Sequence, residues 1–130
     1  MGEALVKLVK IPEFADSRGR LLVCEFEEAL PFIPVRTFII SDVPEGATRA
    51  SHSVSCDLFL VVLRGTGTLT AATSETSEVH PLSANAVGVH VPAGTWILLS
   101  DFTPETQILV HASKRFREVK YVSDPPIKIA

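Results

Sequence analysis

Short apolar runs alternate with turn-forming residues along the whole chain. The clearest run covers residues 58–63, where six apolar residues follow one another, as in a strand buried on both faces. Shorter runs recur at intervals of about ten residues, separated by Gly, Pro, Asp, Asn or Ser. This pattern predicts strands over residues 4–11, 21–26, 35–41, 58–63, 68–73, 78–82, 87–91, 95–100 and 105–112.

Two strand pairings follow from the turn signals. We expect an N-terminal hairpin over residues 4–26, with its turn at residues 16–19. Gly65 and Gly67 allow a tight reversal, so we expect strand 58–63 to pair with strand 68–73. Residues 114–120 fit either a strand or a helical turn, and residues 27–29 fit one helical turn. The tail, residues 127–130, is either loose or docked on a partner.

The number and spacing of these strands predict an all-β fold, either a barrel or a double-sheet jelly roll. No stretch shows the apolar periodicity of a long amphipathic helix. With 130 residues, the chain is expected to form one domain over residues 1–130, large enough for a substantial core.

Composition and charge exclude several classes of protein. Hydrophobic residues make up 46% of the chain, which argues against a disordered protein. The net charge of −3 argues against binding nucleic acid or an anionic membrane through bulk charge. No apolar run reaches membrane-spanning length, and the first residues lack the order of a signal peptide. We therefore expect a cytoplasmic protein whose partners include neither nucleic acid nor a membrane.

The two cysteines, Cys24 and Cys56, form no C-x-x-C pair, so the sequence indicates no cysteine zinc site. Both lie beside apolar runs and fit small buried side chains. A nucleophilic pair of Cys56 with His52 is the alternative. Four residues span about 13 Å in an extended chain, so this pair requires a bend.

Polar residues gather just before the buried run at residue 58. The stretch contains Arg49, Ser51, His52 and Ser53, and it follows a turn signal at residues 44–46. A polar cluster at the open end of buried strands is a plausible site for chemistry, because the scaffold fixes the side chains while solvent reaches one end.

The spacing around this cluster resembles the cupins, small jelly-roll barrels. Gly46, five residues and then His52 fit the first cupin motif, and residues 92–94 fit the Pro-x-Gly of the second. The remaining metal-ligand positions hold Val54, Leu58 or Phe59, and Ile97. One imidazole offers too few ligands to hold a transition metal tightly. The sequence therefore predicts a cupin that works without a metal or other cofactor.

Nearly the whole chain resembles one cupin group, the sugar 3,4-ketoisomerases (WxcM-like) that act on dTDP-4-oxo-6-deoxyglucose. This resemblance implies a homodimer of jelly-roll barrels that exchange N-terminal strands. It also implies a dTDP-linked 4-oxo-6-deoxyhexose in the barrel mouth and proton transfer between C3 and C4. The matching segments are Asp16-x-Arg18-Gly19-x-Leu21, Pro31-Phe32, Arg36-x-Phe38-x-Ile40, Asp42-Val43-Pro44-x-Gly46, Arg49-x-x-His52, Gly65-x-Gly67, Val91-Pro92-x-Gly94-x-Trp96 and Asp101-Phe102.

The chain departs from that group at positions close to the motif. The group has Arg-Gly-x-His-x-His, whereas this chain has Ala50 at the glycine and Val54 at the second histidine. Ile97 stands where the group usually has a polar residue. The tyrosine of its Ser-x-x-Tyr pattern is replaced by Phe116, and Lys120 precedes Tyr121 in place of Asp.

His52 is the predicted acid/base, because moving a carbonyl from C4 to C3 requires a proton to leave C3 and one to reach C4. The developing oxyanion needs a donor, and Arg49 is the candidate. Residues three apart on a strand point to opposite faces, so Arg49 must lie on the turn to help. The plain alternative for His52 is a polar residue at a strand end.

Four further residues are predicted to bind substrate. Arg18 suits the diphosphate but also fits an ion pair with Asp16. Arg36 suits a phosphate or is a solvated charge at the start of a strand. Trp96 is either a stacking platform or part of the core, and Tyr121 is a binding residue and a weaker acid/base candidate.

The sequence thus favours a metal-independent nucleotide-sugar isomerase that moves a keto group between C4 and C3. One alternative is a non-catalytic cupin that binds a nucleotide sugar or a partner enzyme, which the valine at position 54 favours. Another is a cupin that binds a small apolar ligand, suggested by Val54, Ile97 and the apolar strands.

Overall fold

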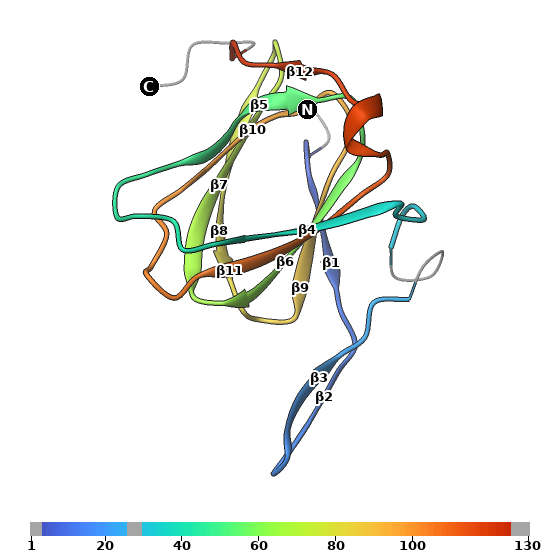
Figure 1. The fold of residues 1–130 in the computed structure, drawn as a ribbon, viewed down its shortest axis with the longest axis vertical. Helices are drawn as coiled ribbons and strands as arrows, with labels where there is room; N and C mark the ends of the chain where they lie inside the picture. The colour runs from blue at the N-terminus through green and yellow to red at the C-terminus, as the bar shows by residue number, and fades with distance from the viewer. Residues whose placement is uncertain (1–3, 26–29, 126–130) are drawn as a thin grey trace.

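In the computed structural model, which describes residues 4–25 and 30–125, two five-stranded antiparallel sheets pack face to face (Figure 1). This confirms the predicted all-β jelly-roll fold. The first sheet has the order β1-β9-β6-β11-β4 and the second β12-β5-β10-β7-β8. Their bounds are β1 Lys7–Lys10, β4 Arg36–Ser41, β5 Arg49–Val54, β6 Leu58–Arg64, β7 Thr66–Ala72, β8 Ser77–Ser83, β9 Val87–Val91, β10 Trp96–Ser100, β11 Gln107–Ala112 and β12 Tyr121–Val122.

The core lies between the two sheets, because every second residue of each strand points inward. Leu60 and Val110 of the first sheet meet Leu69 and Leu99 of the second, and each is at most 2% exposed. The outer face of β6 is also covered, since Phe59 and Val61 belong to a second buried cluster. This double burial explains the uninterrupted apolar run of β6.

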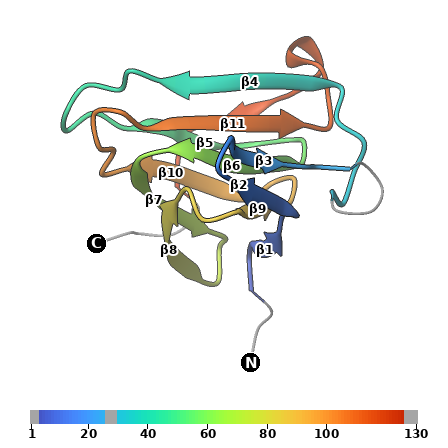
Figure 2. The same ribbon diagram turned by 90° about the horizontal axis from the view of Figure 1, so that it is seen from below.

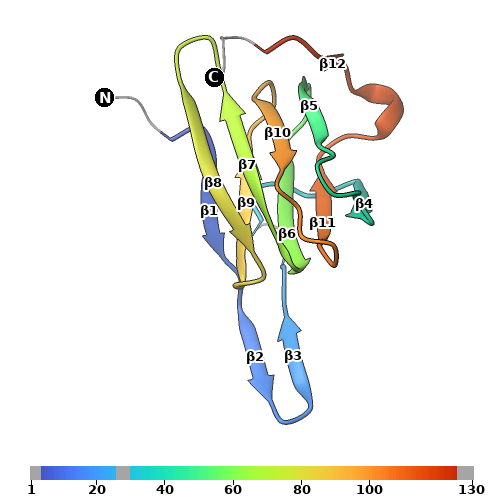
Figure 3. The ribbon, with the colours of Figure 1, turned by 90° about the vertical axis from the view of Figure 1, so that its left-hand side faces the viewer.

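The N-terminal segment differs from the predicted hairpin over residues 4–26. Strand β1 pairs with β9, and Pro12 separates it from a short hairpin formed by β2 (Glu13–Asp16) and β3 (Gly19–Leu22). This hairpin projects from the barrel (Figure 3). The turn at residues 16–19 was predicted correctly, but the strands it joins are 13–16 and 19–22. Residue 26 lies outside the described part of the chain.

The predicted pairing of strand 58–63 with strand 68–73 is wrong. At Gly65 the chain crosses from one sheet to the other, so β6 pairs with β9 and β11, whereas β7 pairs with β8 and β10. The crossing is held by Thr103 and Thr106, whose Oγ1 atoms both accept from Thr66 N at 3.1 Å. The glycine therefore serves a corner between sheets and not a hairpin.

The end of the barrel beside Val54 is framed by the C-terminal part of the described chain. After β11, the chain forms a 3-10 helix over Phe116–Glu118, and β12 then pairs with the end of β5. The helical turn was one of two predictions for residues 114–120. The short strand β12 was not predicted. The predicted helical turn at 27–29 and the tail at 127–130 lie outside the described residues.

Strand β4 forms one edge of the first sheet, beside β11 (Figure 2). Its side chains alternate, with Phe38 and Ile40 half-buried on the inner face and Thr37 and Ile39 exposed on the outer face. In the part of the chain that is described, no helix has the length and apolar character needed to cross a membrane.

Candidate active site

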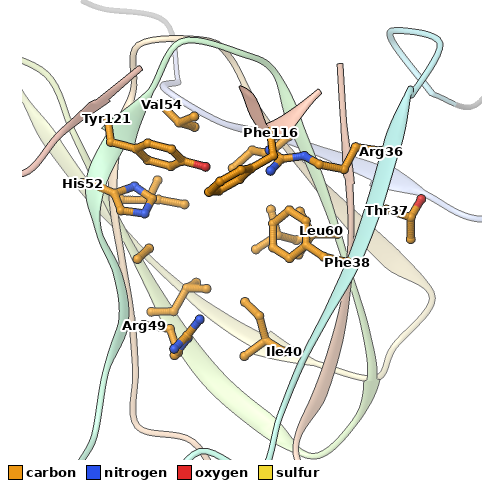
Figure 4. Close-up of a pocket in the computed structure, with 15 residues that line it drawn as sticks. Arg36, Thr37, Phe38, Ile40, Arg49, His52, Val54, Leu60, Phe116 and Tyr121 are labelled. Carbon is orange, nitrogen blue, oxygen red and sulfur yellow. The ribbon is translucent and has the colours of Figure 1, made fainter. Parts of the chain in front are cut away.

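A cavity of about 630 Å³ lies between the two sheets at the barrel mouth (Figure 4). The first sheet supplies one wall, with β4 at its edge, and β5, β10 and β12 supply the other. Most of the lining is apolar, and its polar members include two arginines, one histidine and one tyrosine. The lining residues are Arg36, Thr37, Phe38, Ile40, Arg49, Ala50, His52, Val54, Leu58, Leu60, Ile97, Leu99, Val110, Phe116 and Tyr121.

A β-bulge in β5 brings Arg49 and His52 onto the same wall. Ile97 of β10 lies opposite His52, and the next residue, Leu98, lies opposite Ala50, so Ser51 is an extra residue in β5. Ala50 and Ser51 have φ values of 66° and 61°. The extra residue makes Arg49 and His52 effectively two positions apart, and both therefore line the cavity. Arg49 reaches the cavity from a strand and not from a turn.

His52 is half-buried, and one of its ring nitrogens is enclosed. Burial lowers the pKa of its imidazole below 6.5, and the positive charge of Arg49 lowers the pKa further, while a backbone hydrogen bond opposes both effects. Its Nδ1 atom is buried and has no hydrogen-bond partner among the described residues. The ring is thus mainly neutral at pH 7, with a nitrogen able to accept a proton.

Arg36 lies across the cavity from His52 and is stacked between two rings. Its guanidinium carbon is 5.1 Å from the ring centre of Phe38 and 5.6 Å from that of Phe116. Its Nε atom is buried without a hydrogen-bond partner among the described residues. A held, unpaired guanidinium suits an anionic group, and a phosphate oxygen matches its geometry.

Tyr121 lies beside His52 on the same wall. Tyr121 lies in β12, opposite Val54 of β5. Its ring makes an edge contact with the His52 imidazole, and the two ring centres are 4.8 Å apart. Figure 4 shows the hydroxyl directed into the cavity toward Phe116 and Arg36. Sequence reasoning named Tyr121 as a candidate, but nothing in the sequence indicated that it contacts His52.

Two predicted binding residues lie outside this cavity. Trp96 is 5% exposed and donates from Nε1 to the carbonyl of Ser123 at 3.0 Å, which matches its alternative interpretation as a buried structural residue. Arg18 lies on the β2–β3 hairpin, where its guanidinium binds the Asp16 carboxylate, with Nη2 2.6 Å from Oδ2. Its side chain is 87% exposed and contributes nothing to the cavity of its own chain.

The cavity floor is apolar where metal-binding cupins carry ligands. Val54 and Ile97 line it beside His52, and of the two candidates for the glutamate position Leu58 faces the cavity, whereas Phe59 packs in the outer cluster. Within the described ranges, no group of three or more His, Cys, Asp or Glu side chains is placed to hold a metal. The residues present do not fit the metal site of the fold.

Cys56 is 1% exposed in the core and does not line the cavity, so the geometry gives no nucleophilic pair with His52.

Sequence reasoning missed the two aromatic residues that hold Arg36. Phe38 could have been found from the alternation of β4, since it shares the inner face with Arg36 and Ile40. Phe116 carries no comparable signal, because it comes from a helical turn whose position over the mouth depends on tertiary structure. Arg49 also lines a second cavity of about 300 Å³, together with residues of the loop at 42–48.

Comparison with known proteins relates this geometry to a family of enzymes. Residues 4–126 match the family described as FdtA: WxcM-like, C-terminal. The TDP-4-oxo-6-deoxy-alpha-D-glucose-3,4-oxoisomerase of Aneurinibacillus thermoaerophilus is 26% identical over 117 residues, which is 89% of this chain and 84% of that enzyme.

Solved structures of similar proteins share the fold over almost the entire chain. A variant of the 3,4-ketoisomerase QdtA from Thermoanaerobacterium thermosaccharolyticum, in complex with TDP-4-keto-6-deoxyglucose, has a TM-score of 0.88 at 26% identity. The match covers 95% of this chain and 90% of QdtA. The WlaRB TDP-quinovose 3,4-ketoisomerase from Campylobacter jejuni has a TM-score of 0.86 at 21% identity, with 92% of each chain covered.

Proposed function

Because the chain belongs to the FdtA family (WxcM-like, C-terminal), we propose that it is a nucleotide-sugar isomerase. Its substrate is a dTDP-linked 4-oxo-6-deoxyhexose, whose keto group it moves between C4 and C3. The activity of the Aneurinibacillus relative and the ligand bound to QdtA support this substrate class. One observation of the site carries the proposal: an imidazole with an enclosed, unpaired nitrogen faces a cavity that also holds two arginines.

His52 is the acid/base of the proposed reaction. Its neutral imidazole removes the proton from C3 while the C4 oxygen gains a proton, which gives an enediol. The imidazolium then returns the carbon proton to C4 while the C3 hydroxyl loses its proton. One ring can serve both carbons from one face of the sugar, because C3 and C4 are neighbours. The lowered pKa favours the neutral base that starts the reaction in this direction.

The two cavity arginines take different roles in this proposal. Arg49 shares the wall of His52 through the bulge and donates to the oxyanion that develops at C4. Arg36, held between Phe38 and Phe116 on the opposite wall, binds the diphosphate. Figure 4 shows the two guanidinium groups well separated in the cavity, as these two roles require. Arg18 can reach such a cavity only from a second copy of the chain.

The experiment compares the unmodified protein with His52→Asn on dTDP-4-oxo-6-deoxyglucose, followed by NMR in deuterated water. We expect isomerisation with exchange at C3, and a loss of about 10²- to 10⁴-fold in turnover in the variant. The affinity for dTDP, measured by calorimetry, is expected to stay nearly unchanged because the imidazole faces the sugar. The matched control is His80→Asn, since His80 pairs with Glu78 on β8 and does not line the cavity.

A second candidate function is a non-catalytic cupin that binds a nucleotide sugar or a partner enzyme. The observation that favours it is the apolar floor beside His52, where Val54 is 3% exposed and carries no transferable proton. Tight dTDP-sugar binding without C3 exchange in the unmodified protein would establish this alternative. Full C3 exchange in His52→Asn would instead remove His52 from the mechanism while keeping the enzyme.

A further inference from the structure

The proposed isomerisation moves two protons, and His52 accounts for only one of them. The proton on C3 must reach C4, and the proton on the C3 hydroxyl must reach the oxygen at C4, because the carbonyl changes place. A single imidazole occupied by the carbon proton cannot carry the oxygen proton at the same time. The reaction therefore calls for a second group that both donates and accepts a proton beside His52.

Tyr121 is placed beside His52 by the pairing of two strands. Residues directly opposite in an antiparallel pair point to the same face, so Tyr121 shares the inward face of Val54. Its ring lies between two others, with centres 4.8 Å from His52 and 6.1 Å from Phe116. The phenol thus extends over the position where this chain has valine in place of a second histidine.

The exposure and surroundings of the phenol suit contact with a ligand. The residue is 43% exposed at the mouth of the cavity, and its hydroxyl points into the cavity (Figure 4). A tyrosine hydroxyl is both donor and acceptor, which a group moving a proton between two oxygens requires. Val54, Phe116 and Ile97 around it have no side-chain group that can carry a proton.

From this placement, and resting on the proposed isomerase function, we propose that Tyr121 carries the proton between the two sugar oxygens while His52 carries the proton between the two carbons. In the first half, His52 takes the C3 proton and Tyr121 gives its hydroxyl proton to the oxygen at C4, which leaves an enediol, an imidazolium and a phenolate. In the second half, the imidazolium protonates C4 and the phenolate takes the proton of the C3 hydroxyl. The keto group is then at C3, and both side chains return to their starting states without any other reactant.

The test uses two substitutions that separate chemistry from packing. Tyr121→Phe keeps the ring against His52 and removes only the hydroxyl, whereas Tyr121→Leu removes both. If Tyr121 transfers a proton, both variants lose about 10²- to 10⁴-fold in kcat, and C3 exchange in deuterated water falls with it. The Kd for dTDP should change by less than about threefold in Tyr121→Phe. The acid limb of its pH profile should also stay in place, because His52 keeps its ring contact.

A purely positioning role for Tyr121 would give a different result. If Tyr121 only positions His52, Tyr121→Phe will retain wild-type kcat and exchange and Tyr121→Leu will not, which overturns the inference and leaves the isomerase function intact. The matched control is Val122→Ala, the neighbouring exposed residue of the same strand, which tests whether disturbing β12 alone reduces activity. An unmodified protein that shows no isomerisation at all would refute the proposed function itself.

Discussion

At the scale of single residues, the setting of His52 defines the pH range in which the proposed enzyme works. Burial is the largest influence on its pKa, and Arg49 adds to it, so the pKa lies below 6.5. The base must be neutral to accept the C3 proton. We therefore expect kcat/KM to fall as the pH falls through this lowered pKa, with the midpoint of the acid limb below 6.5.

A pH profile of the unmodified protein and of Arg49→Gln checks this prediction. Removing the positive charge lifts the pKa of His52, so the acid limb of the variant should move toward higher pH even though its rate is lower. If the midpoint of the acid limb lies above pH 6.5 in the unmodified protein, or does not shift in Arg49→Gln, the assigned electrostatics are wrong.

The residues of the site were largely predictable, but their arrangement was not. The spacing from Gly46 identified His52, and the residue type identified Arg36 and Arg49. What the sequence did not reveal is the bulge at Ser51, because its left-handed conformations fall on Ala50 and Ser51 and not on glycine. Without that bulge, strand alternation would place Arg49 and His52 on opposite faces.

At the scale of elements, the corner at Gly65 leaves no room for a side chain. Its φ is +79°, and an added Cβ would lie 2.6 Å from the Cα of Thr106 and 2.8 Å from Oγ1 of Thr103. We expect Gly65→Ala to lower the free energy of unfolding by at least about 2 kcal/mol, from backbone strain together with overpacking.

Gly46→Ala is the matched control for this prediction, and urea titration measures the free energy of unfolding of both variants. Gly46 has a similar φ of +81°, but nothing lies within 4 Å of the added Cβ. Its cost should be limited to the conformational part, about 1–2 kcal/mol. An equal loss of unfolding free energy in the two variants would show that overpacking at the corner adds nothing to the cost of Gly65→Ala.

Elements with strong local patterns were predicted well, whereas their partners were not. The strand at residues 87–91 was predicted with its observed bounds, because a loop signal at residues 83–86 precedes it and Pro92 follows it. The predicted partner of the strand at 58–63 was wrong, because a glycine turn has the same sequence signature in a hairpin and in a corner between sheets. The strand Tyr121–Val122 is too short for any periodicity and depends on pairing with β5.

At the scale of the whole molecule, the projecting hairpin supports the predicted homodimer. Phe14 and Leu21 lie opposite each other in β2 and β3, and they are 64% and 59% exposed. Two adjacent apolar side chains on a projecting hairpin indicate a surface that another chain covers. We propose that each hairpin packs on the partner barrel, in line with the strand exchange that the family resemblance implies.

Sedimentation at micromolar concentration tests this proposal. The unmodified protein should be a dimer, and the double variant Phe14→Ser, Leu21→Ser should raise the dimer Kd by at least about tenfold, because burying one such side chain is worth about 1.5–3 kcal/mol. Val79→Ser serves as the control, since Val79 is 66% exposed on β8 and lies outside the hairpin. A monomer in the unmodified protein would refute the dimer.

The bulge in β5 also has a consequence for how this protein can evolve. Two adjacent non-glycine residues in left-handed conformation cost about 1–3 kcal/mol each, and only Ala50 offsets part of this cost by packing against the core. Selection for thermal stability alone should therefore replace Ala50 or Ser51 by glycine or shorten the strand by one residue. Either change keeps Arg49 and His52 on the same wall, because a strand shortened by the extra residue leaves them two positions apart. If Ala50 and Ser51 persist under selection for stability, the bulge itself must serve the function of the cavity.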